Sequence, residues 1–88
     1  MTEHDAENRV TELYACASGM LKLCLTAGEP EAAKAAAFLV LHFEPTEEVR
    51  LRILAERQWP LLESDVAASM RALAESVLRG QFLGETSH

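Results

Sequence analysis

The chain has 88 residues, of which 49% are hydrophobic and 25% charged, and its formal net charge is −6. This length indicates one domain, and the composition is that of a globular protein rather than a disordered one. The acidic balance argues against nucleic-acid binding, because neutralising phosphates requires clustered Lys and Arg. The apolar residues are mostly Ala and Leu, which are strong helix formers, so we expect an all-α fold.

A first helix is predicted from Val10 to Ala27, after a frayed stretch of about residues 1–7. Apolar residues recur in it at alternating steps of three and four, which places them on one helix face. We expect this face, widened by Tyr14 and Leu21, to point into the core; it comprises Val10, Leu13, Ala17, Met20, Cys24 and Ala27. Three further apolar residues lie off the face: Cys16, Leu23 and Leu25. The end of this helix therefore favours a central position or a partner on its second face.

Gly28 suits the position that ends this helix, and Pro30 suits the first turn of a second helix running to about Phe43. Thr46 is a candidate N-cap of a third helix that runs to about Gln58. We expect this third helix to turn three apolar residues inward: Val49, Ile53 and Leu54. Trp59 and Pro60 then interrupt the helical pattern, because the residue before a proline is disfavoured in the helical conformation.

A fourth helix is predicted to begin at a cap formed by Ser64 or Asp65 and to end at Gly80. Its apolar stripe is the clearest in the chain: Val66, Met70, Leu73 and Val77. Short joints make sequential helices antiparallel neighbours. We therefore expect a single domain over residues 1–88, built as two stacked helical hairpins or a four-helix bundle, with frayed ends at about 1–7 and 84–88.

The segment from about Val10 to Pro45 resembles a tetratricopeptide repeat. Gly28 stands where that family has its inter-helix turn, Ala33 where its two helices touch, and Pro45 where the unit ends. The chain departs from the pattern at four positions: Ala17, Leu21, Leu61 and Val66. In size, acidity and Ala/Leu-rich helices it is similar to the small tetratricopeptide-like chaperones of bacterial type III secretion. That resemblance implies a protein that cradles an amphipathic helix of an aggregation-prone partner.

The residue types that carry chemistry are not grouped in this sequence. His4, His42 and His88 fall on separate elements, and Cys16 and Cys24 lack the spacing of a metal site, so we expect no metal and no cofactor. Both cysteines are expected to be reduced, buried thiols. No glycine-rich phosphate loop or activated-nucleophile motif is present in the sequence. We therefore expect no catalytic residues, no enzyme activity and no small-molecule substrate.

Neither a transmembrane helix nor a signal peptide is expected, since no apolar run reaches about 18 residues and the first residues are acidic. The polar faces of the helices are mainly acidic, which disfavours binding to a membrane surface. These features predict a cytoplasmic protein.

The apolar residues that do not fit a single inward stripe predict a binding surface for another protein. The candidate partner-binding residues are Leu23, Leu25, Leu39 and Trp59, with Glu29 and Glu31 attracting a basic partner. One interpretation is a chaperone or adaptor that holds an apolar helix between its hairpins. A second is a homodimeric regulatory inhibitor, such as an antiactivator or immunity-type protein. A third is a small helical domain whose extra leucines are scattered over the surface.

Overall fold

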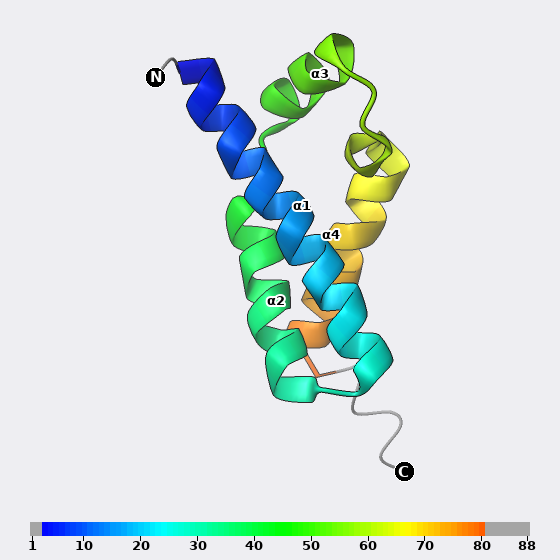
Figure 1. Ribbon diagram of the computed structural model, residues 1–88. Helices are drawn as coiled ribbons and strands as arrows, with labels where there is room; N and C mark the ends of the chain where they lie inside the picture. The colour runs from blue at the N-terminus through cyan, green and yellow to red at the C-terminus, as the bar shows by residue number, and fades with distance from the viewer. Residues whose placement is uncertain (1–2, 81–88) are drawn as a thin grey trace.

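The computed structural model describes residues 3–80, and every regular element in that range is helical (Figure 1). Four α-helices and one 3₁₀ turn follow in chain order: α1 (Glu3–Ala27), α2 (Pro30–Phe43), α3 (Glu47–Glu56), η1 (Pro60–Leu62) and α4 (Ser64–Leu78). The expected all-α class is confirmed for this range. The predicted fraying of residues 84–88 lies outside the described residues.

A helix-ending motif at Gly28 joins α1 to α2. The amide of Glu29 donates to the carbonyl of Cys24 over 3.0 Å, and the amide of Gly28 donates to the carbonyl of Leu25 over 3.3 Å. This pair of bonds is the Schellman arrangement, and Gly28 adopts the φ of +72° that it requires. Pro30 is the first residue of α2, so the chain reverses within a few residues and the two helices pack antiparallel.

The core lies where α1, α2 and α4 meet. Helix α2 contacts both α1 and α4, and its buried residues are mostly small: Ala33, Ala36, Ala37 and Val40. Small side chains allow close backbone approach, while larger residues from the other elements fill the remaining space: Tyr14, Leu21, Ile53, Leu62, Met70 and Val77. The packing of α1, α2 and α4 is therefore the centre of the fold.

Helix α3 lies at the far end of the molecule from the Gly28 turn and stands away from α1 in Figure 1. Thr46 caps it as predicted, since its hydroxyl accepts a hydrogen bond of 3.2 Å from the amide of Val49. Two arginines of α3 contact other elements, η1 and α1. Nη1 of Arg50 donates to the carbonyl of Leu62 over 2.7 Å, and Nη2 of Arg52 lies 2.9 Å from Oε1 of Glu7.

Three element boundaries differ from the sequence-based expectation. Helix α1 begins at Glu3 rather than Val10, so residues 3–7 are helical and not frayed. Helix α3 ends at Glu56, two residues before Gln58. Helix α4 begins at Ser64 with Glu63 as its N-cap, so neither predicted residue holds the cap position, although Oδ1 of Asp65 accepts a hydrogen bond of 3.0 Å from the first-turn amide of Val66. The physical reason at the first boundary is that acidic residues favour a helix N-terminus and extend α1.

No helix within residues 3–80 has the length and apolar character needed to cross a membrane.

Candidate functional site

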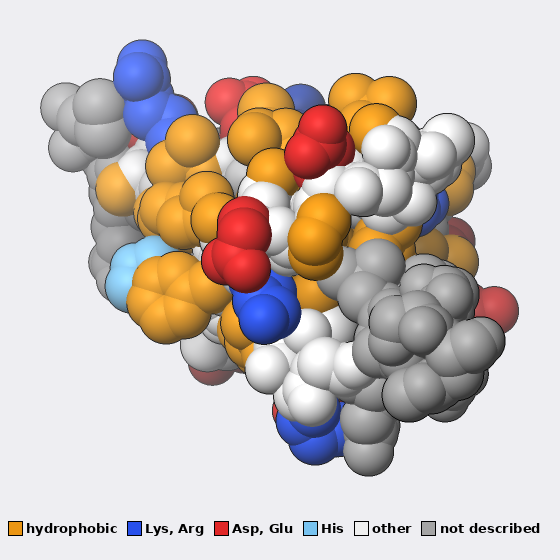
Figure 2. Space-filling view, turned by 90° about the horizontal axis from the view of Figure 1, so that it is seen from below, with side chains coloured by type: hydrophobic (Ala, Val, Ile, Leu, Met, Phe, Trp, Pro, Cys, Tyr) orange, Lys and Arg blue, Asp and Glu red, His pale blue; other side chains and the backbone are white. Residues whose placement is uncertain are grey.

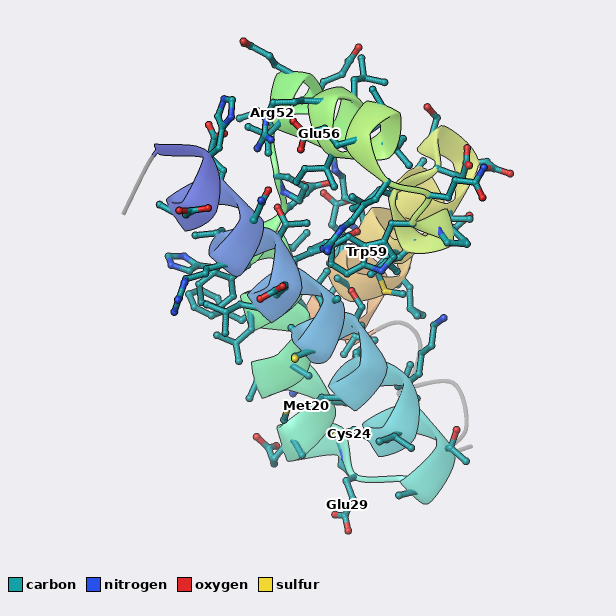
Figure 3. All side chains as sticks on the ribbon, turned by 45° about the horizontal axis from the view of Figure 1, so that its top comes forward. Met20, Cys24, Glu29, Arg52, Glu56 and Trp59 are labelled. Atoms are coloured by element: carbon teal, nitrogen blue, oxygen red, sulfur yellow. The ribbon has the colours of Figure 1, made fainter. Side chains whose placement is uncertain are left out.

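Helix α1 exposes the stripe that its sequence pattern predicted to be buried. Val10 is 42% exposed, Leu13 is 48% exposed and Met20 is 51% exposed, whereas Ala17 is buried between them. We call these residues, with Cys24 and Ala27, the α1 stripe. Figure 3 shows Met20 and Cys24 on the same side of α1, beside α2. The prediction that this whole face points into the core is wrong for its large residues.

A neighbouring face of α1 is buried instead, and it includes two hydroxyl residues. Thr11 donates its hydroxyl hydrogen to the carbonyl of Glu7 over 2.9 Å, and Ser18 donates to that of Tyr14 over the same distance. Both hydroxyls are thus satisfied within the helix, which removes most of the cost of burying them. Tyr14 and Leu21 on this face supply the bulk that fills the core.

A shallow apolar groove opens between α1 and the start of α3. Its volume is about 380 Å³, and four apolar residues line it beside Thr11 and Thr46: Ala6, Val10, Pro45 and Val49. The groove exists because α3 contacts α1 through long side chains rather than through close backbone packing. Glu7 and Glu44 lie at its rim. Such a groove can accept one or two apolar side chains of another molecule.

A smaller polar cavity of about 150 Å³ lies on the other side of Pro45. Nε of Arg71 donates to Oε2 of Glu44 over 2.8 Å at its edge. The phenol of Tyr14 also lines it, and its buried oxygen has no hydrogen-bond partner among residues 3–80. Burial raises the pKa of this phenol above 10.0, and the carboxylate of Glu44 raises it further.

The partner-binding residues proposed from sequence fall into two groups. Leu23 is 71% exposed, and Glu29 and Glu31 are exposed near the turn that ends α1. Leu25, Leu39 and Trp59 are half-buried and pack against the core instead. In Figure 3, Glu29 lies at the tip of the hairpin and Trp59 lies well away from it. The structure therefore does not bring the six residues together in one groove.

Trp59 has a local role that its sequence position does not reveal. The guanidinium carbon of Arg57 lies 4.4 Å from the centre of its ring, a cation–π contact. The ring also packs against the hydrophobic core. These contacts fix the break between α3 and η1.

Groups that could support metal chemistry do not converge among the described residues, since no cluster of three or more His, Cys, Asp or Glu side chains is found there. Cys16 is exposed rather than buried, because it lies on the outer side of α1, and Cys24 is half-buried.

Figure 2, which views the molecule from below, shows apolar side chains reaching the surface in a broad patch with single charged side chains among them.

Sequence reasoning missed the groove, although it identified Val10 and Val49 as apolar positions on their helices. It assigned both to the core, because a periodic pattern does not show how far apart two helices stand.

Comparisons with protein-family models, with curated proteins and with solved structures find no match for this chain.

Proposed function

We propose that the chain is a non-enzymatic protein-binding module, an adaptor or chaperone that holds an amphipathic helix of a partner protein in the cytoplasm. The observation that carries the proposal is the open apolar groove between α1 and α3. An amphipathic helix offers apolar side chains at positions i, i+3, i+4 and i+7, and such helices bind into apolar grooves of other proteins. The groove volume of about 380 Å³ suits one or two of these side chains.

Charge around the groove favours a partner helix with basic residues beside its apolar face. The exposed carboxylates of Glu47 and Glu48 stand in the first turn of α3, whereas Glu7 and Glu44 in the lining are already paired with arginines of this chain. The chain as a whole carries a net charge of −6. Opposite charge on the partner would speed encounter and favour it over acidic helices. The resemblance to type III secretion chaperones likewise implies an amphipathic helix as the partner.

The proposal is tested with two synthetic amphipathic peptides of equal length, one built from Leu and Lys and the other from Leu and Glu. We expect the Lys peptide to bind and the Glu peptide not to bind, as measured by peptide fluorescence anisotropy at low ionic strength. Ala6→Phe fills the groove from an exposed helical position and should abolish binding. Ala72→Phe, at an exposed position on α4, is the matched control and should bind like the parent. Equal binding of the two peptides, or unaltered binding by Ala6→Phe, contradicts the proposal.

The alternative function, a homodimeric regulatory inhibitor, is favoured by a different observation. Three large apolar side chains of α1 are about half exposed or more: Leu13, Met20 and Leu23. Exposed apolar side chains gathered on one helix are a feature of interaction sites.

A further inference from the structure

The polar cavity beside Pro45 is lined by nearly every part of the fold. Its wall takes residues from α1, from the link between α2 and α3, from α3 itself, from η1 and from α4. Its volume of about 150 Å³ is that of a cavity able to hold one benzene molecule. A cavity of this size admits a small molecule and is too small for the side of a helix.

Tyr14 brings a buried polar atom to this wall. The residue is 1% exposed, and its hydroxyl has no hydrogen-bond partner in the range 3–80. The charged groups that act on this hydroxyl all belong to the same wall: Glu44, Arg71 and Arg50. The phenol is therefore directed at the charged cluster of the cavity. Burying a hydroxyl without a partner is unfavourable, and a ligand that supplies the partner removes that cost.

The phenol of Tyr14 is a hydrogen-bond donor at neutral pH. Burial raises its pKa and the carboxylate of Glu44 raises it further, so the group keeps its proton. A protonated phenol can donate to an acceptor of the ligand, and it forms its strongest bond when that acceptor is an anion.

Arg50 supplies a positive charge to the same cavity. It forms no ion pair with a carboxylate of residues 3–80, and its Nη1 donates to the carbonyl of Leu62 over 2.7 Å. The guanidinium has further N–H groups beyond this bond. Ser64, the first residue of α4, also lines the cavity and brings the positive end of that helix to it. Donors and positive charge therefore meet at the phenol of Tyr14.

A cationic ligand fits this wall less well. Both carboxylate oxygens of Glu44 already accept from Nε of Arg71, over 3.1 and 2.8 Å. Glu47, the other carboxylate of the wall, is exposed to solvent. Two arginines and two glutamates line the cavity, so their formal charges cancel. A ligand with one negative charge meets no net repulsion there, and it suits the site better than a doubly charged phosphate.

We propose that this cavity binds a small monocarboxylate, whose carboxylate accepts hydrogen bonds from Arg50 and from the hydroxyl of Tyr14. A short apolar body lies against the apolar part of the wall, which comprises Pro45, Leu62, Ala67 and Ala68. The cavity and the apolar groove lie on either side of Pro45 and share only Glu44 and Pro45. The inference therefore does not depend on the proposed function.

The test is a titration with sodium propionate at constant ionic strength, with the phenol as reporter. Tyr14 is the only tyrosine, so protein labelled with ¹³C at the tyrosine Cζ gives one resonance, and that resonance comes from this site. We expect the resonance to shift with propionate concentration and to saturate. The amide resonances of the first turn of α4 should move with the same dissociation constant.

Two substitutions report on the two donors. Tyr14→Phe keeps the ring and should weaken propionate binding about tenfold or more, as expected for the loss of a hydrogen bond to a charged group. Arg50→Gln should abolish the binding, since it removes the positive charge. The amides of α4 follow the titration in both variants, and circular dichroism verifies that Arg50→Gln keeps its helices, because Arg50 also bonds to Leu62.

A third substitution blocks the cavity without touching either donor. Ala68→Leu fills it from an exposed position on α4 and should abolish propionate binding. Ala72→Leu, at an exposed position of α4 outside the wall, is the matched control and should bind like the parent. Ala6→Phe, which fills only the groove, should lose the helical peptide and keep propionate. The two sites can therefore fail independently of each other.

Other probes identify the outcomes that contradict the proposal. Saturable binding of methylammonium in place of propionate would show that the carboxylates of the wall dominate, and would overturn it. Tighter binding of inorganic phosphate than of propionate would overturn the choice of a monocarboxylate. The absence of a saturable shift with propionate, or an unchanged affinity in both Tyr14→Phe and Ala68→Leu, would overturn the site itself.

Discussion

Nη2 of Arg52 on α3 lies 2.9 Å from Oε1 of Glu7 on α1, and this contact bridges two helices whose backbones barely meet (Figure 3). Both side chains are only partly exposed, at 20% and 30%. Glu7 also stands at the rim of the apolar groove. The ion pair therefore sets the distance between the two walls of the groove.

Glu7→Gln should loosen α3 more than it destabilises the whole chain. A partly exposed ion pair contributes up to about 1 kcal/mol to the free energy of unfolding, so the global loss should be of that size or smaller. The amides at the start of α3 should nevertheless exchange with deuterium faster, since the ion pair is the shorter of the two bonds that Arg52 makes to α1, the other going to Oδ1 of Asn8 over 3.4 Å. Glu56→Gln removes the exposed i,i+4 partner of Arg52 within α3 and serves as the control. Equal exchange of α3 amides in both variants would contradict the bridging role.

Tyr14→Phe should leave the chain at least as stable as the parent. The ring fills the core, but its buried hydroxyl finds no hydrogen-bond partner in the part of the chain that the structure describes. Leaving a buried polar group unsatisfied costs about 1–3 kcal/mol, and phenylalanine keeps the ring while removing that cost. Urea unfolding of the two proteins measures the difference. A clear loss of stability in Tyr14→Phe would show that the hydroxyl is bonded, for example by water in the adjoining cavity.

Alkaline pH should destabilise the folded chain through Tyr14. Its pKa is raised in the folded state by burial and by Glu44, above the ordinary value of 10.0. Above pH 10 the unfolded chain therefore loses the phenolic proton before the folded chain does. The free energy of unfolding falls as the pH rises from 10 toward the pKa of the folded state. Tyr14 is the only tyrosine, so phenolate absorbance follows it directly. The pH dependence of urea unfolding in this range should be weaker in Tyr14→Phe, and an identical dependence would rule out this cause.

The helix boundaries that sequence predicts well are those set by local chemistry. Gly28, Pro30 and Thr46 each act on the backbone within a few residues, and the structure has a turn, a helix start and a cap at these positions. The start of α4 was predicted less well, because Glu63 takes the cap position without a side-chain bond. Local signals of this kind do not depend on what the helix later packs against.

The buried face of α1 could not be predicted in the same way. Two overlapping faces compete on this helix: the periodic stripe through Leu13 and Met20, and the face through Tyr14 and Leu21. Periodicity favours the first because Thr11 and Ser18 interrupt the second with polar atoms. Those hydroxyls bond to carbonyls of their own helix, so burial costs them little, and the bulk of Tyr14 decides the outcome. The groove exists only because α3 stands away from α1, and the apolar pattern of a single helix carries no information about that distance.

Two glycine-to-alanine substitutions should act in opposite directions. Gly19 lies exposed inside α1, and a Cβ there would meet nothing within 4 Å. Gly19→Ala should therefore raise the free energy of unfolding by about 0.5–1 kcal/mol, since alanine is the better helix former. Gly28 also has open space around it, but its φ of +72° disfavours any side chain.

Gly28→Ala should accordingly lower the free energy of unfolding by about 1–2 kcal/mol. Thermal and urea unfolding at a fixed protein concentration measure both variants, and the fixed concentration keeps any dimerisation from shifting one relative to the other. Because neither substitution meets a neighbouring atom, the difference between them isolates backbone conformation from packing. Equal effects at the two positions would mean that the chain does not reverse at Gly28 in the left-handed conformation.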